Sequence, residues 1–218
     1  MVGILITAGP TREYLDDVRF LSNGSSGRMG SALAEAALAD SHTVYLVLGP
    51  VELSPPALAT VCSVTSALEM QAAAEHWFPQ CDIVIAAAAV ADFRPLVRQA
   101  GKPSRQNAAP SLQLIPNPDI IAGLAVRKGS RVMVGFALES AAASMAQAVA
   151  RGREKLERKQ LDLVVCNRSD AIGMQVSEAV LLFADGRQVT LTVQNKSMTA
   201  AAIVRASVSL WQQKLRAL

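Results

Sequence analysis

The sequence has few of the residues that support metal, redox or nucleic-acid chemistry. It contains three cysteines and two histidines in 218 residues, with no Cys-x-x-Cys pair and no zinc-type spacing. A disulfide framework and a zinc site are therefore not expected. Aromatic residues make up only 4% of the chain, and the net charge of +3 is too small to predict nucleic-acid binding. The basic cluster at 151–159 also contains glutamates, so it is either a solvated helix face or a place where a triphosphate could be held.

Long hydrophobic runs and targeting signals are also absent. Hydrophobic residues make up 51% of the chain, yet no apolar stretch approaches the roughly 20 residues that span a bilayer. The N-terminus has no basic region followed by an apolar stretch and a cleavage site. We therefore expect a soluble, cytoplasmic protein with no membrane partner, in which Cys81 and Cys166 are buried free thiols. Residues 1–218 are expected to form a single domain.

Apolar runs of strand length alternate with helical patterns along most of the chain. This alternation predicts an α/β fold with a doubly wound, mostly parallel, Rossmann-like sheet that is covered on both faces. Strands are expected at 2–8, 43–48, 82–88, 112–115, 131–137 and 161–166, and helices at 29–39, 66–78, 141–159 and 196–215. Asp185-Gly186 lies between two strand-like segments and predicts a C-terminal β-hairpin extension.

The sequence also predicts local features of individual segments. Leu68 and Met70 are expected among the core positions of the helix at 66–78, and Asn117 is expected to cap a short helix that begins at Pro118. The segment 89–110 has little periodicity, and a structureless connection of this length is usually functional or disordered.

A glycine- and hydroxyl-rich loop follows the first predicted strand. Glycines at 24, 27 and 30 allow backbone N–H groups to approach an anion, and a helix beginning near Arg28 would direct its positive end at the same point. The glycine spacing matches neither the dinucleotide-binding pattern nor a P-loop. The loop is therefore either a phosphate site or a glycine-rich connection between strand and helix.

Seven short motifs occur in a fixed order along the chain. They are Ile6-Thr-Ala-Gly-Pro-Thr-Arg-Glu13, Ser22-Asn23-Gly-Ser-Ser-Gly-Arg-Met-Gly30, Thr65-Ser-Ala-Leu-Glu-Met70, Ala87-Ala-Ala-Val-Ala-Asp-Phe-Arg94, Asn117-Pro-Asp-Ile120, Gly135-Phe-Ala-Leu-Glu139 and Lys159-Gln-Leu-Asp-Leu163. In this order they resemble phosphopantothenoylcysteine synthetases. The resemblance covers essentially the whole chain, and seven collinear motifs are far more specific than one glycine loop.

The resemblance implies a reaction in coenzyme A biosynthesis. It is the ligation of 4′-phosphopantothenate to L-cysteine in two half-reactions, through an acyl-nucleotide intermediate. CTP is the favoured co-substrate, with ATP as the alternative, and Mg²⁺ is required. Members of the family are dimers, so a homodimer is expected. In bacteria the synthetase is often the C-terminal half of a protein whose N-terminal half is a flavin-dependent decarboxylase. We therefore expect the decarboxylase to be a separate polypeptide and expect no flavin in this chain.

This chemistry explains the residue types that the motifs contain. A carboxylate is a poor electrophile, so its oxygen must first attack the α-phosphorus of the nucleotide and expel pyrophosphate. Cations and a divalent metal offset the charge that develops in this step. The amine of cysteine then attacks the acyl carbonyl, and the resulting oxyanion needs hydrogen-bond donors.

The resemblance assigns most of the cations to the nucleotide. Lys102 is the first candidate, although relatives have Lys-Ile-Lys-Lys where this chain has Lys102-Pro-Ser-Arg105. Lys155 and Lys159, one helical turn apart, are expected to contact nucleotide, and Asp92 is expected near the ribose or the metal. The ring of Phe136 is expected either on the nucleotide or in the core. The complete nucleotide set is Ala86, Asp92, Lys102, Asn117, Pro118, Asp119, Ile120, Phe136, Lys155 and Lys159.

The second half-reaction is assigned to the glycine-rich loop. Asn23 matches the active-site asparagine of the family, whose amide can donate to the acyl carbonyl, so Asn23 and Lys102 are the catalytic candidates. The residues expected to bind the substrate and the acyl intermediate are Gly9, Ser22, Asn23, Gly24, Ser25, Ser26, Gly27 and Arg28.

Two other functions remain as alternatives. A nicotinamide-dependent oxidoreductase is disfavoured because neither Tyr14 nor Tyr45 is followed four residues later by lysine, and no acidic residue closes the second strand. A catalytically silent nucleotide-binding subunit is compatible with the altered loop after Lys102. The base of the nucleotide leaves almost no mark in sequence.

Overall fold

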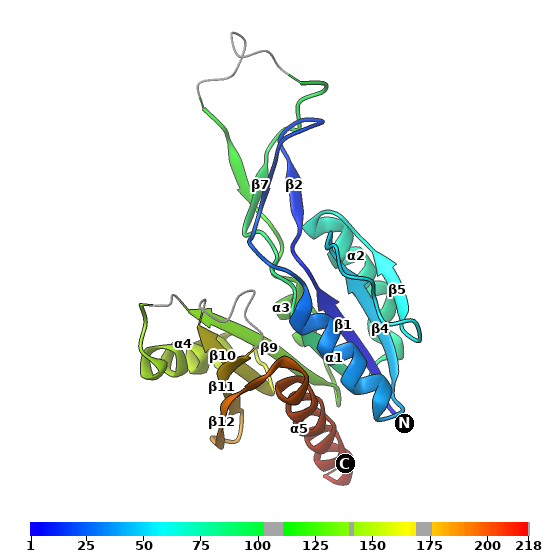
Figure 1. The fold of residues 1–218 in the computed structure, drawn as a ribbon, viewed down its shortest axis with the longest axis vertical. Coiled ribbons are helices and arrows are strands. Elements are labelled where there is room, and N and C mark those ends of the chain that lie inside the picture. Colours follow the sequence, from blue (N-terminus) through cyan, green and yellow to red (C-terminus); the bar gives the residue numbers. More distant parts are fainter. Residues whose placement is uncertain (103–110, 140–141, 169–175, 218) are drawn as a thin grey trace.

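The structure is a computed structural model that describes residues 1–102, 111–139, 142–168 and 176–217. Its centre is an eight-stranded sheet with the order β12-β11-β10-β9-β6-β1-β4-β5 (Figure 1). The strands are β1 (Gly3–Ala8), β4 (Thr43–Leu48), β5 (Thr60–Ser63), β6 (Ile83–Ala86), β9 (Val132–Glu139), β10 (Leu163–Arg168), β11 (Val176–Phe183) and β12 (Gln188–Asn195).

Six of these strands are parallel, and their order is that of a doubly wound fold. From β5 to β10 the parallel strands follow the chain order 3-2-1-4-5-6, and β11 and β12 extend the sheet antiparallel. The predicted fold class is therefore confirmed. The strand order reverses direction between β1 and β6, which places the topological switch point there.

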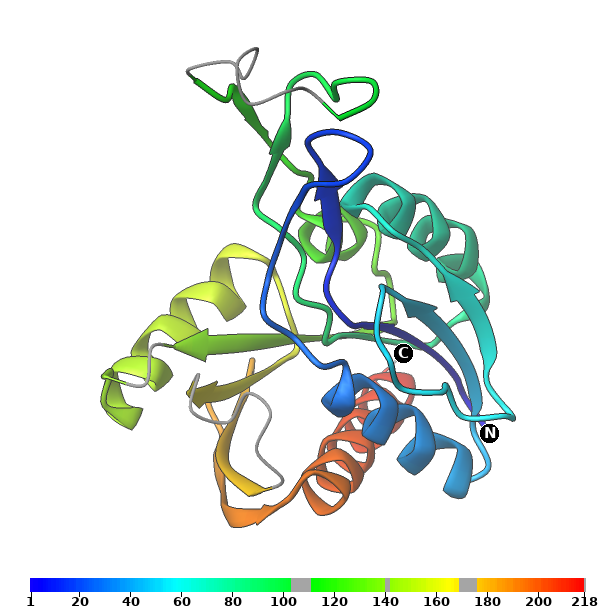
Figure 2. The same ribbon diagram turned by 45° about the horizontal axis from the view of Figure 1, so that its top comes forward.

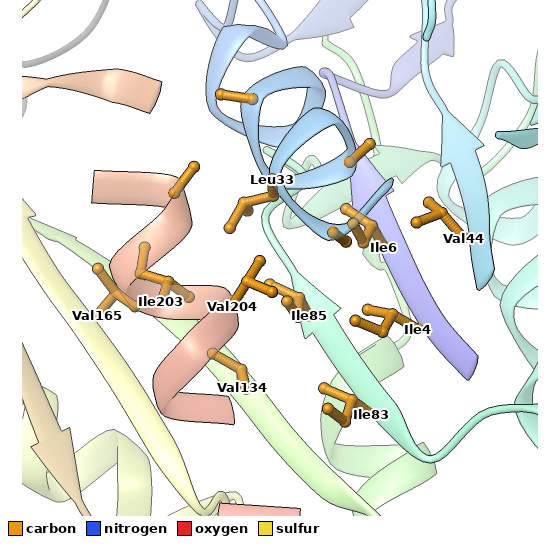
Figure 3. Close-up of a cluster of buried hydrophobic side chains, with 14 of the residues drawn as sticks. Ile4, Ile6, Leu33, Val44, Ile83, Ile85, Val134, Val165, Ile203 and Val204 are labelled. Atoms are coloured by element: carbon orange, nitrogen blue, oxygen red, sulfur yellow. The ribbon is translucent and has the colours of Figure 1, made fainter. Parts of the chain in front are cut away.

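Helices cover both faces of the sheet. α1 (Arg28–Ala39) and α5 (Lys196–Arg216) cover one face, while α2 (Ala67–Trp77), α3 (Ile120–Ala125) and α4 (Met145–Arg158) cover the other. Successive residues of a strand point to opposite faces, so Ile4 and Ile6 pack toward α1 and α5 (Figure 3), whereas Leu5 packs toward α2. All three side chains are fully buried, which explains why β1 appears in the sequence as a continuous apolar run.

A two-layered projection, which we call the arm, rises beyond the carboxyl ends of the parallel strands (Figures 1 and 2). It consists of the antiparallel pairs β2 (Arg12–Tyr14) with β3 (Phe20–Ser22) and β7 (Phe93–Pro95) with β8 (Leu114–Pro116). An ion pair of 3.0 Å between Arg98 and Asp17 joins the two layers, and the Arg98 guanidinium lies over the Tyr14 ring. The large apolar side chains that the arm exposes are Val18, Phe20, Phe93, Leu96, Val97, Leu112 and Leu114.

The turn between β2 and β3 is built around one carboxylate. Asp16 accepts hydrogen bonds from the backbone N–H groups of Arg19 (2.7 Å) and Val18 (2.8 Å), and the Arg19 side chain pairs with it at 2.6 Å. These backbone hydrogen bonds, foremost the one from Arg19, lower the pKa of Asp16 to about 2. The turn therefore keeps its negative charge at any physiological pH.

The hairpin and the buried thiols agree with the sequence predictions. Phe183 donates its backbone N–H to Arg187 at 3.0 Å, and Gly186 adopts φ +90°, the left-handed conformation that this turn requires. Cys81 and Cys166 are free and buried, and burial is the main reason that their pKa values rise to about 12 and about 11. No helix among the described residues is both long and apolar enough to span a membrane.

Several element predictions were wrong. The strand expected at 112–115 lies in the arm, where β8 pairs with β7, and not in the main sheet. β5, at the sheet edge, and the arm strands β2, β3 and β7 have no periodic signal in the sequence and were missed. Leu68 is 46% exposed, because the buried face of α2 is made by its alanines and Met70. The helix expected from 141 begins at Met145, where the side chain of Ser144 and that of Gln147 form a capping box.

Candidate functional site

A large cavity lies over the carboxyl ends of the parallel strands, at the topological switch point. Its volume is about 740 Å³, a typical size for a small-molecule site. The strands contribute Thr7 of β1, Ala86 of β6 and Gly135 and Phe136 of β9. In doubly wound sheets, ligands collect at this position because loops from both sides of the switch point diverge there.

The glycine-rich loop forms one wall of the cavity, from Asn23 to Gly30. Gly27 is the N-cap of α1 with φ +72°, a conformation that side chains rarely adopt. A Cβ atom at Gly30 would lie 2.2 Å from the Cβ of Ala8, so only glycine allows α1 to approach β1 this closely. The glycines thus bring the first turn of α1 to the strand end where the cavity begins.

Asn23 connects this loop to the segment that follows β6. Its amide nitrogen donates to the carbonyl of Val90 at 2.9 Å and lies 3.4 Å from the carbonyl of Ala89. The shorter hydrogen bond fixes the side chain at the cavity wall. The contact with Ala89 is long and weak, so the amide has donor capacity left at the cavity wall.

Two residues that the sequence assigned to the substrate lie outside the cavity lining. Ser22 donates its hydroxyl to the carbonyl of Thr11 at 2.7 Å, which fixes the end of β3 against the start of β2. Gly9 is buried with φ +75°, and a Cβ there would meet Gly49 and Val51. The described contacts of both residues are with the protein, so a direct contact with substrate stays a prediction for them.

Asp92 and the segment 117–120 also line the cavity. Asn117 donates its backbone N–H to the carbonyl of Asp92 and its side-chain amide to the carbonyl of Ala91, both at 2.8 Å. Its amide oxygen accepts from Arg94 at 3.1 Å. Asn117 is therefore not the helix cap that the sequence predicted. Asp119 caps α3, because its carboxylate accepts from the N–H of Ala122 at 3.3 Å.

Lys155 and Lys159 enter the cavity from the end of α4. The ammonium of Lys159 pairs with Asp119 at 2.6 Å, and that of Lys155 donates to the carbonyl of Phe136. Burial, and next the positive charge of Lys159, lowers the pKa of Lys155. Phe136 itself is half-buried: its ring packs on the core and also lines the cavity, so both roles considered for it are sterically compatible.

Lys102 does not reach the cavity of its own chain. It is exposed on the arm, next to Gly101, whose backbone forms two hydrogen bonds with Asp17 at the β2–β3 turn. These contacts hold the start of the loop beside the tip of the arm. The remainder of the loop, including Arg105, lies outside the described residues. A contact between Lys102 and a nucleotide therefore stays a prediction.

Asn167 and Lys196 are among the lining residues that were missed in the sequence. Asn167 follows the buried part of β10, and its side-chain oxygen is buried with no hydrogen-bond partner in the described part of the chain. Its position at the carboxyl end of a predicted parallel strand is a signal that could have identified it. Lys196, the first residue of α5, gave no such signal, because it follows an antiparallel strand and reaches the cavity only through the packing of α5.

The cavity has few carboxylates for a resident metal ion. Among the described residues, no three His, Cys, Asp or Glu side chains are grouped so that they could hold one. A Mg²⁺ ion commonly binds through one or two carboxylates together with substrate phosphates. Asp92, which lines the cavity, fits that kind of site as a single carboxylate.

The sheet order and the cavity define an α/β protein of the doubly wound class with its ligand site at the switch point. The chain belongs to the family described as the DNA/pantothenate metabolism flavoprotein C-terminal domain, whose model matches residues 2–210. The crystal structure of the C-terminal domain of coenzyme A biosynthesis bifunctional protein CoaBC is similar, with a TM-score of 0.83 and 32% identity. That match covers 97% of this chain and 96% of the crystallised one.

Two longer proteins are similar in sequence. The coenzyme A biosynthesis bifunctional protein CoaBC of Vibrio cholerae serotype O1 is 40% identical over 207 residues, covering 92% of this chain and 51% of that protein. A protein named cysteine/cysteine sulfinic acid decarboxylase, from an unknown prokaryotic organism, is 39% identical over 213 residues, covering 95% and 58%. The chain thus spans little more than half the length of these curated relatives.

Proposed function

We propose that this chain is a phosphopantothenate–cysteine ligase that acts in coenzyme A biosynthesis. The reaction joins the carboxylate of 4′-phosphopantothenate to the amine of L-cysteine and converts CTP into CMP and pyrophosphate. CTP is proposed over ATP from the family resemblance. The similarity along the full length of a CoaBC C-terminal domain supports the assignment to this half of the bifunctional protein.

The observation that carries the proposal is the convergence of distant segments on one cavity. Residues expected from the sequence to act on nucleotide and acyl group come from five separate segments, yet they line the same space. The residues brought together are Asn23, Gly24, Ser25, Ser26, Gly27, Arg28, Ala86, Asp92, Asn117, Pro118, Asp119, Ile120, Phe136, Lys155 and Lys159.

The chemistry divides between two groups of lining residues. Lys155 and Lys159 supply positive charge for the phosphates of the nucleotide, in a partly buried position where charges interact more strongly than in water. Mg²⁺, when bound with the nucleotide, supplies further charge neutralisation at its phosphates, with Asp92 as its carboxylate ligand. Asn23, in the glycine-rich loop, donates an amide N–H to the acyl carbonyl while the amine of cysteine attacks.

The arm supports a homodimer. Among the described residues of the arm, seven large apolar side chains are exposed, and Val97 and Phe93 are 69% and 53% exposed. Exposed apolar patches mark interaction surfaces. In the proposed dimer the arm of one chain brings Lys102 to the nucleotide bound by its partner, which accounts for the position of Lys102 outside its own cavity.

The test is an assay with 4′-phosphopantothenate, cysteine and Mg²⁺, with CTP and ATP in parallel. We expect pyrophosphate and phosphopantothenoylcysteine with CTP, both dependent on phosphopantothenate. Nucleotide binding without turnover would identify a silent subunit, and nicotinamide reduction would identify an oxidoreductase. Release of CO₂ from cysteine or cysteine sulfinic acid would instead match the decarboxylase-named relative. Each of these results would contradict the ligase proposal.

A further inference from the structure

Thr11 lies between two segments that meet at Asn23, and it is outside the cavity lining. The residue is polar, yet it is 0% exposed. Its hydroxyl oxygen accepts a hydrogen bond from the backbone N–H of Ala91 at 3.0 Å, and its carbonyl accepts one from the hydroxyl of Ser22 at 2.7 Å. Ala91 lies in the segment after β6, and Ser22 is the last residue of β3. One buried threonine thus joins the start of the glycine-rich loop to the segment after β6.

The hydroxyl of Thr11 holds a peptide group that also holds Asn23. The N–H of Ala91 and the carbonyl of Val90 belong to one planar, trans peptide unit, in which they point in opposite directions. Thr11 accepts from that N–H, and the Asn23 amide donates to that carbonyl at 2.9 Å. The rotation of this peptide therefore sets where the acceptor for Asn23 lies. The second link, through Ser22, holds the backbone directly before Asn23.

The far end of this segment has a support of its own. Asn117 donates its side-chain amide to the carbonyl of Ala91 and its backbone N–H to the carbonyl of Asp92, both at 2.8 Å. These hydrogen bonds do not involve Thr11. Without the Thr11 hydroxyl, the N–H of Ala91 would be buried with no partner, and rotation of its peptide would relieve that cost. The displacement should therefore be larger at Asn23 than at Asp92.

We infer that Thr11 is a positioning residue for the second half-reaction. It holds the Asn23 amide where that amide can donate to the acyl carbonyl. This inference rests on the proposed function, in which Asn23 stabilises the oxyanion. Catalytic groups have to be held to within about 0.5 Å of their productive geometry, and a misplacement of about 1 Å can cost roughly 100-fold in rate. A buried hydroxyl that fixes the acceptor of Asn23 provides this support.

The test compares Thr11→Val with Thr11→Ser by rapid mixing and chemical quench, with 4′-phosphopantothenate, cysteine, CTP and Mg²⁺. Valine has the shape of threonine but no hydroxyl, whereas serine keeps the acceptor. Ser207→Ala is the control, because it removes a buried hydroxyl that bonds within α5, away from the cavity lining. Ser22 is exposed, so Ser22→Ala breaks the second link in a variant that should fold even if Thr11→Val does not. Pyrophosphate and amide product are followed separately, and a thermal melt verifies folding.

For Thr11→Val we expect amide formation to slow roughly 10- to 100-fold, while the pyrophosphate burst stays within about twofold of the wild-type rate. Ser22→Ala should slow the same step, Thr11→Ser should recover most of the rate, and Ser207→Ala should change neither step. Combination with Asn23→Ala separates positioning from other effects. Once the donor is absent its position no longer matters, so adding Thr11→Val to Asn23→Ala should cause no further slowing.

The role is overturned if Thr11→Val slows pyrophosphate release and amide formation equally, if Thr11→Ser does not restore the rate, or if the effects of Thr11→Val and Asn23→Ala multiply. Unchanged amide formation in both Thr11→Val and Ser22→Ala would overturn it as well. These failures would arise in variants of an active chain. A wild-type chain that forms no amide product would instead contradict the ligase proposal, and this inference with it.

Discussion

Replacing Asn23 by aspartate should separate the two half-reactions. The Asn23 amide is the donor that we assign to the acyl carbonyl, and an ionised carboxylate cannot donate. The change should leave acyl-nucleotide formation largely intact, because we assign the nucleotide phosphates to Lys155 and Lys159, which line the same cavity, and not to Asn23. Attack by cysteine should slow, because the oxyanion that develops on the acyl carbonyl loses its donor.

The structure sets the size of each effect. Removing one preorganised oxyanion donor typically costs roughly 10²- to 10³-fold in rate, and we expect a loss of that order in amide formation. The effect on folding should be small, because Asn23 is exposed and makes one close hydrogen bond, to Val90. Such a bond contributes about 1 kcal/mol to the free energy of unfolding. Asn23→Ala, which also lacks the donor but brings no negative charge toward the Val90 carbonyl, should give the same kinetic result.

The assay is rapid mixing with chemical quench, following pyrophosphate and amide product separately. Asn23→Asp should give a burst of pyrophosphate close to one equivalent per site, with little amide product on the same time scale. Gln71→Ala, which removes one side-chain hydrogen bond on α2 far from the cavity lining, serves as the folding control. Equal slowing of pyrophosphate release and amide formation would refute the role assigned to Asn23.

Three further predictions concern charge, packing and assembly. Burial and the charge of Lys159 lower the pKa of Lys155, so Lys155 loses its charge as the pH rises through that lowered pKa. Nucleotide affinity should fall over the same pH range, and binding should be accompanied by proton uptake. Calorimetry at several pH values measures both, and a pH dependence that persists in Lys155→Gln would contradict this prediction. Gly30→Ala should lower the free energy of unfolding, measured in urea, by roughly 1–3 kcal/mol or more, because the added Cβ would lie 2.2 Å from that of Ala8. Gly123→Ala is the control, since a Cβ at Gly123 would lie in open space and should be neutral or stabilising. Equal effects of the two substitutions would disprove the packing argument. Val97→Asp should shift a dimer toward monomer in sedimentation velocity and reduce activity, and an unchanged dimer would exclude the arm as the interface.

Much of the sheet was predictable because its strands are buried on both faces. Ile4, Leu5 and Ile6 have to be apolar whichever way they point, so β1 appears as an uninterrupted run in the sequence. The arm was not predictable in the same way. Its strands are three residues long and partly exposed, so they carry no periodicity, and their pairing depends on contacts such as Arg98 with Asp17 that are distant in sequence.

The residues of the candidate site were likewise predictable only in part. The loop from Asn23 to Arg28 and the positions of Lys155 and Lys159 on one helix were predictable from motifs, and the structure brings them to one cavity. The cap of α3 was misassigned because Asn117 and Asp119 are both good capping residues, and only the hydrogen bonds from Asn117 to the segment after β6 decide between them. Lys196 depends on the packing of two helices that are far apart in sequence, which no local pattern contains.

In the proposed reaction, the acyl group is activated by transfer of a nucleotide to its carboxylate. This activation is tested most directly with 4′-phosphopantothenate labelled with ¹⁸O in the carboxylate, incubated with the chain, CTP, Mg²⁺ and cysteine, and followed by mass spectrometry. The carboxylate oxygen that attacks the α-phosphorus stays on that phosphorus when cysteine displaces the nucleotide. We therefore predict one ¹⁸O atom in CMP, one in the amide product and none in pyrophosphate. Formation of CDP with ¹⁸O in inorganic phosphate, or no label transfer at all, would contradict the account.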